Sequence, residues 1–160
     1  MNDGKKTLVF PDVSGSNLEG KSRRLPNDFE DDLNIVIIAF RREHTDMIES
    51  WLNSLAQMIR KNTKLRFYEL PVLSRAYSPF RWWIDGGMRA GIVDEEARER
   101  TVTVYTNKRE FKRRLQIPNE ETIYIFLVSR NGTILWQDKG RFTEAKFQNL
   151  QNAVQEDLFV

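Results

Sequence analysis

The feature that most constrains the fold is a largely apolar stretch, residues 33–40, which contains the continuous β-branched run Ile35–Ile38 and is followed by an amphipathic pattern over residues 45–61. The stretch reads Leu-Asn-Ile-Val-Ile-Ile-Ala-Phe and lacks the polar alternation of a strand with one solvated face. Such β-branched runs are typical of strands covered on both faces, as in α/β sheets. In the second segment apolar residues recur every three or four positions, which predicts a helix with one buried face.

The remaining chain predicts a mixed sheet around this unit, because the Asn131-Gly132 turn joins two neighbouring strands as an antiparallel hairpin. Further strands are predicted at 10–15, 20–26, 65–70, 101–106, 122–128 and 134–136. Further helices are predicted at 108–116 and from Thr143 onward, and a helical insertion within 74–100. The first two strands form an N-terminal β-hairpin, and Pro71 is expected to end the strand at 65–70. We expect the long helix and the C-terminal helix on opposite faces of the sheet, or split between them.

Length and charge restrict the class of protein. The 160 residues predict a single domain over 7–160 after a disordered tail at 1–6. A net charge of +2 is too small to indicate nucleic-acid binding, and none is expected. No apolar run approaches the roughly 20 residues that span a bilayer. Residues 1–6 lack the apolar segment of a signal peptide, but a leader could have been removed, so the compartment stays open.

Several short segments occur in the order used by a known superfamily. They are Phe10–Gly15, Glu19–Pro26, Ile35–Phe40 and Phe126–Trp136, followed by Gly140 and Thr143. In this order the chain resembles thioredoxin-like proteins of the peroxiredoxin and alkyl-hydroperoxide-reductase branch. Its layout is similar to that of the thioredoxin-like assembly factors of mitochondrial ATP synthase. Those proteins carry a similar aromatic, methionine-containing insertion and end in a similar strand, tryptophan, glycine and helix.

The residues that carry redox chemistry in this superfamily are absent. The resemblance places Thr45 and Ile48 at the two Cys-x-x-Cys positions, and Ile123 at the cis-proline that faces them. The chain has no cysteine at all. Thiol exchange needs a sulfur nucleophile at the helix N-terminus, where the dipole lowers its pKa. We therefore expect no thiol peroxidase or disulfide oxidoreductase activity, and no cofactor.

The turn that replaces the redox motif contains Arg42, Glu43, His44 and Asp46. Together they form a candidate ligand site, and Glu43, His44 and Asp46 with Glu49 could hold a hard cation or form an acid–base pair. The alternative is structural: Asp46 and Glu49 form a capping box, and Glu43 pairs with Arg41 or Arg42. One histidine without cysteine is poor material for a transition-metal site, and no metal is predicted.

Two other stretches are candidate contact surfaces. Phe80, Trp82 and Trp83 belong to an aromatic segment that is either core or a protein-binding surface, with Trp82 off the apolar face. The 108–116 helix presents a basic face that either receives an acidic partner or phosphates, or is simply solvated. Its basic residues are Lys108, Arg109, Lys112, Arg113 and Arg114.

Two classes of function follow from these observations. The first is a non-catalytic interaction or assembly-factor domain, of chaperone type, that binds an unidentified protein partner and has no thiol redox activity. The second is an enzyme with a non-thiol site at the N-terminus of the long helix. The missing sulfur favours the first, and a ligand bound at that helix end would favour the second.

Overall fold

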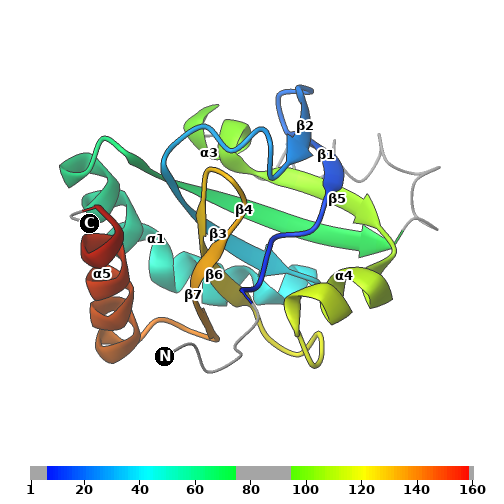
Figure 1. Cartoon of the computed structure of the whole chain (residues 1–160). Helices are drawn as coiled ribbons and strands as arrows, with labels where there is room; N and C mark the ends of the chain where they lie inside the picture. Colours follow the sequence, from blue (N-terminus) through cyan, green and yellow to red (C-terminus); the bar gives the residue numbers. More distant parts are fainter. Residues whose placement is uncertain (1–6, 75–94, 159–160) are drawn as a thin grey trace.

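The computed structural model describes residues 7–74 and 95–158, which form a seven-stranded mixed sheet with helices on both faces (Figure 1). The strand order is β2-β1-β5-β4-β3-β6-β7. The strands are β1 Val13–Asn17, β2 Ser22–Leu25, β3 Leu33–Ala39, β4 Leu65–Ser74, β5 Val102–Thr106, β6 Tyr124–Ser129 and β7 Ile134–Lys139. The helices are α1 Thr45–Lys61, α3 Glu95–Arg100, α4 Lys108–Leu115 and α5 Glu144–Leu158. A 3-10 turn, η1 Arg42–His44, precedes α1.

Strand β3 lies inside the sheet, as its sequence predicts, and every one of its residues is buried. It pairs in parallel with β4, with Leu33 opposite Leu65, and antiparallel with β6, with Leu33 opposite Ser129. A strand with neighbours on both sides and covered faces has no position for a solvated side chain, which explains its largely apolar sequence. Its one polar residue, Asn34, is buried and donates to the Asp31 carbonyl at 2.9 Å. The prediction that this strand is covered on both faces is confirmed.

Helices α1 and α5 cover the same face of the sheet, so the expectation that they lie on opposite faces is wrong. Trp51 of α1 and Leu150 of α5 belong to one apolar cluster with Ile35 of β3. The cause is the turn after β7: the Trp51 indole N–H donates to the Gly140 carbonyl at 2.9 Å, and its ring packs edge-on against Phe142. These contacts direct the chain back toward α1 before α5 begins.

The other face is covered by α4 and the N-terminal segment. Phe111 of α4 packs against Phe10, whose ring also contacts Phe29. The hairpin of β1 and β2 is antiparallel, as predicted. Gly15 is required where β1 pairs with β5, because a Cβ there would lie 2.3 Å from the Thr103 carbonyl oxygen. Sheet and helices therefore enclose two apolar layers.

Strand β4 does not end at Pro71, which corrects the sequence prediction. Pro71 lies opposite Ala39, the last residue of β3, and from Val72 onward the strand pairs in parallel with β5. A proline has no N–H to donate, and it is tolerated here where β4 changes from one neighbour to the other. The strand therefore continues to Ser74 and links the two halves of the sheet.

The predicted helix starts and turns are confirmed in α4, α5 and the last hairpin. Asn107 accepts the Glu110 N–H at 3.1 Å, and Thr143 accepts the Lys146 N–H at 3.2 Å. In the hairpin, Gly132 has a φ of 92°, and its N–H donates to the Ser129 carbonyl. A left-handed glycine after a tight turn matches the right-handed twist of the two strands it connects.

Candidate functional site

The N-terminal end of α1 is built differently from the predicted capping box. The helix starts from the 3-10 turn η1, its cap residue is His44, and no side chain accepts a hydrogen bond from the first turn. The Thr45 hydroxyl instead donates back to the Arg42 carbonyl at 2.7 Å. Asp46 remains in the first turn, where a carboxylate favours the positive end of the helix dipole.

His44 is the one member of the predicted ligand site that points into the protein. His44 is 4% exposed, and its Nδ1 atom is buried with no hydrogen-bond partner among the described residues. Burial lowers the pKa of the imidazole, and the charge of Arg41 lowers it further, while Glu43 and the Glu121 backbone oppose the shift. The imidazole is therefore held neutral at physiological pH.

The other members of this predicted site do not converge on His44. Arg42, Glu43 and Asp46 are exposed, whereas His44 is buried. Within residues 7–74 and 95–158, no group of three acidic or histidine side chains is arranged to hold a metal ion. Among the ion pairs of this described part, none joins Glu43 to Arg41 or Arg42. The four residues share a turn without forming a common pocket.

The degenerate redox positions are close in space. Ile48 and Ile123 belong to the same apolar cluster, in which Ile123 is fully buried. Thr122, directly before Ile123, donates to the Met47 sulfur at 3.4 Å, so the turn before β6 touches the first turns of α1. Thr45 is exposed at the helix start. The three positions that the resemblance assigns to a redox site therefore carry hydroxyl and hydrocarbon groups.

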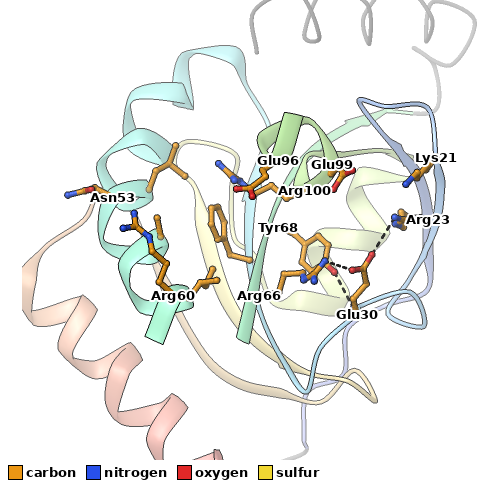
Figure 2. Close-up of a pocket in the computed structure, with 14 residues that line it drawn as sticks. Lys21, Arg23, Glu30, Asn53, Arg60, Arg66, Tyr68, Glu96, Glu99 and Arg100 are labelled. Carbon is orange, nitrogen blue, oxygen red and sulfur yellow. Dashed lines mark hydrogen bonds and ion pairs between the residues drawn. The ribbon is translucent and has the colours of Figure 1, made fainter. Parts of the chain in front are cut away.

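A larger opening lies on the flank of α1, between that helix, β4 and α3 (Figure 2). Its volume is about 870 Å³. Among the described residues that line it, the apolar floor consists of Leu52, Ala56, Ile59 and Phe67. The basic residues are Lys21, Arg23, Arg60, Arg66 and Arg100, and the acidic ones are Glu30, Glu96 and Glu99. We call this opening the α1–α3 groove.

One side of the α1–α3 groove is a network of ion pairs. Glu30 contacts Arg66 and also Arg23, the latter at 3.4 Å, as Figure 2 shows. Arg66 further pairs with Asp31 at 3.1 Å. Tyr68 fixes this loop, because its hydroxyl accepts the Glu30 N–H at 3.1 Å. The charges of this side are therefore paired within the protein.

Arg100 stacks on the apolar floor of the α1–α3 groove. Its guanidinium carbon lies 4.3 Å from the centre of the Phe67 ring, within the range of a cation–π contact. Its Nε atom is buried and has no hydrogen-bond partner in the described residues. The nearby Glu69 is half-buried, and desolvation raises the pKa of its carboxyl, while the Arg100 charge opposes that rise. Arg100 is thus held in place by stacking.

The predicted basic face of α4 is largely neutralised by acidic residues. Lys108 and Lys112 both bind Glu120, at 2.9 and 2.6 Å. Glu110 binds Arg113 and Arg114, and hydrogen bonds from Arg113 and then Arg114 lower its pKa to about 2. Glu110 belongs to α4 itself, three positions before Arg113 and four before Arg114, whereas Glu120 lies after Pro118. This face is a solvated ion-pair network.

The aromatic candidates Phe80, Trp82 and Trp83 lie outside the residues that the structure describes, so their role in partner contact stays a prediction. The α1–α3 groove was missed by sequence reasoning. Its lining comes from four segments that are far apart in the sequence. Only two of them show a recognisable sequence pattern, namely the alternation around Arg66 and the basic C-terminal end of α1. Neither pattern indicates that the four segments lie side by side in the folded protein.

Together, the sheet order and the cysteine-free start of α1 define a protein with a thioredoxin-like fold and no thiol. Sequence comparison narrows this class. The family model described as ATP10 protein matches residues 3–156, and the chain belongs to that family. This agrees with the predicted resemblance to ATP synthase assembly factors. No curated protein matches the chain by sequence.

Solved structures share the fold. A putative thiol:disulfide interchange protein DsbE from Chlorobium tepidum is 17% identical with a TM-score of 0.56, covering 95% of this chain and 96% of that one. A thiol-disulfide oxidoreductase from Bacteroides fragilis is 18% identical with a TM-score of 0.56, covering 90% and 98%. BsSco, a member of the Sco family of cytochrome c oxidase assembly proteins, is 10% identical with a TM-score of 0.61, covering 93% of each chain.

Identities this low establish the fold alone. Both the oxidoreductases and the assembly protein use this framework, so the framework does not select between catalysis and assembly. In the described part of the chain, no helix has the length and apolar character needed to cross a bilayer.

Proposed function

We propose that this chain is a non-catalytic factor that binds a protein partner during the assembly of ATP synthase. The observation that carries the proposal is membership of the ATP10 protein family in a chain whose helix start contains no thiol. Where the fold offers a redox site, this chain has Thr45, Ile48 and Ile123. A protein that has lost the reactive group and kept the surrounding fold is best explained by binding.

The geometry gives no support to the alternative of a non-thiol enzyme at the start of α1. Catalysis by an acid–base pair requires side chains within hydrogen-bond reach of one reacting position. His44 is buried, and Glu43 and Asp46 are exposed to solvent. Binding is therefore the function proposed here.

The test is deletion of the gene in the source organism, followed by native gel electrophoresis of its respiratory complexes. Assembled ATP synthase should fall severalfold, and expression of this cysteine-free chain should restore it. Cytochrome c oxidase is the matched control, since a protein of the same fold serves that complex. Unchanged ATP synthase, or loss of cytochrome c oxidase alone, would overturn the proposal.

A further inference from the structure

We infer that the α1–α3 groove binds an acidic, amphipathic segment of a protein partner. This deepens the proposed function and rests on it, because it assigns a surface and a partner chemistry to a factor proposed to act by binding. The groove is separate from the degenerate redox turn: it lies along the flank of α1, over Phe67 and Tyr68 of β4 (Figure 2).

The charged residues that line the α1–α3 groove favour an acidic partner. Five basic and three acidic described residues line the α1–α3 groove. Glu30 is already shared between Arg23 and Arg66. Lys21 and Arg60 are exposed, and the ion pairs of residues 7–74 and 95–158 include neither of them. An acidic segment would supply the carboxylates that these cations lack.

Arg100 holds its guanidinium in a fixed position in the α1–α3 groove. Its guanidinium is stacked on Phe67 at 4.3 Å and needs no further ordering before it binds a carboxylate. Guanidinium groups bind carboxylates through paired donors, and preorganisation removes part of the entropic cost of binding. The Nε atom is buried, so the guanidinium would bind a carboxylate of the partner through its other N–H groups.

An apolar floor lies between the charged residues of the α1–α3 groove. Leu52, Ala56 and Ile59 lie on the α1 side of the α1–α3 groove, and Phe67 lies on β4. An apolar floor with a basic rim matches a segment that alternates apolar and acidic side chains. The opening of about 870 Å³ is large enough to receive a chain segment rather than a single ion.

The basic face of α4 shows why the α1–α3 groove is the better candidate. Four of the five basic residues of α4 are bound by Glu110 or Glu120, so an acidic partner would have to displace internal ion pairs. On the groove side, Lys21 and Arg60 require no such displacement. Charge complementarity therefore favours the groove.

The experiment uses a short fluorescein-labelled peptide that alternates glutamate with leucine, and fluorescence anisotropy with the full chain. Binding should weaken as salt is raised, because exposed charges are screened. The Lys21→Glu/Arg60→Glu variant should lose about tenfold or more in affinity, since like charges then face the peptide. A peptide with lysine in place of glutamate should bind the wild-type chain at least tenfold more weakly.

The matched control is Arg109→Glu/Lys139→Glu, which changes net charge equally at two exposed positions outside the α1–α3 groove. It should bind within about twofold of the wild type, because long-range effects of exposed charges are screened in salt. Equal losses in both double variants would overturn the proposal, as nonspecific attraction explains them. A third arm uses vesicles of phosphatidylcholine and phosphatidylserine, and binding to vesicles without binding to the acidic peptide would also overturn it.

The complementation assay separates the two proposals. If Lys21→Glu/Arg60→Glu restores ATP synthase as well as the wild type does, the groove proposal fails and the assembly function stands. If deletion leaves ATP synthase unchanged, the assembly function fails, and peptide binding still reports on the groove. Both double variants must unfold at the same midpoint as the wild type for these comparisons to hold. If Lys21→Glu/Arg60→Glu is destabilised, Arg100→Gln replaces it, because it removes the guanidinium over Phe67 and keeps a polar side chain.

Discussion

The two ends of α1 differ in what they present to solvent. At the N-terminal end, His44 is turned inward, Ile123 is buried, and Thr122 closes over Met47. Along the C-terminal half, Ala56, Ile59 and Arg60 face the open α1–α3 groove. The fold family places chemistry at the first end. In this chain the buried part of that end is filled by an imidazole and hydrocarbon groups, while an open groove with an apolar floor lies along the other half of the helix.

The largest expected difference between these regions is in packing. Trp51→Ala should lower the free energy of unfolding by about 3–5 kcal/mol, because Trp51 is fully buried and large core truncations leave cavities. The neighbouring Leu52→Ala, which truncates a half-buried side chain at the groove, should cost less than about 2 kcal/mol. Urea denaturation of both variants measures the difference. Equal losses would show that the groove is as tightly packed as the core.

A second test uses the neutral state of His44. Its folded pKa lies below the ordinary value of about 6.5, so the unfolded chain binds the proton more readily. The stability that this group contributes is complete above that ordinary value and is lost as pH falls toward the lowered folded pKa. Denaturation at pH 8 and pH 5.5 should show a smaller loss for His44→Gln than for the wild type.

His44 is the only histidine of the chain, so no other imidazole contributes to this comparison. Identical pH dependence in the variant and the wild type would contradict the lowered pKa. Titration of the imidazole by NMR gives the same answer directly.

A third test asks whether the start of α1 can still activate a thiol. In Thr45→Cys the new thiol lies at the N-terminus of a 17-residue helix, and its pKa should fall below the ordinary value of about 8.5. In Asn149→Cys the thiol lies on the exposed surface of α5, away from the helix start, and should keep that value. The pH dependence of iodoacetamide labelling distinguishes them. The wild-type chain should read as blank in insulin-reduction and peroxide-consumption assays.

The smallest effect is expected from Arg60→Glu. Arg60 is exposed in the last turn of α1, where a cation interacts favourably with the helix dipole. Reversing its charge should cost about 0.3–1 kcal/mol in unfolding free energy. A loss comparable to that of Trp51→Ala would mean that Arg60 supports the fold rather than the groove.

The sequence predicted those parts of the fold that depend on local patterns. The apolar run at 33–39 specifies a buried strand, Asn107 and Thr143 specify helix starts, and Gly132 specifies a turn. These features are decided within a few residues of the chain. The side on which α5 lies could not be predicted, because it depends on the hydrogen bond between Trp51 and Gly140, which are 89 positions apart.

The candidate site shows the same limit more strongly. The sequence alone shows that the turn before α1 contains no cysteine and therefore no thiol. The capping box failed because a 3-10 turn shifted the helix start onto His44, and backbone geometry of this kind leaves little trace in side-chain types. The α1–α3 groove depends on bringing together Lys21, Arg60, Arg66 and Arg100 from four segments. Their pairing with acidic residues is decided only in three dimensions.

The register between β3 and β6 has a consequence for synthesis on the ribosome. Leu33 pairs with Ser129, so β3 gains its second neighbour only after a further 96 residues have been made, 129 minus 33. At translation rates of 5–20 residues per second, this takes roughly 5–20 s. During that time the apolar strand has an open edge, to which another nascent chain can add. The step most exposed to aggregation is therefore the emergence of residues 33–129, and slowing translation over that stretch should lower the soluble yield.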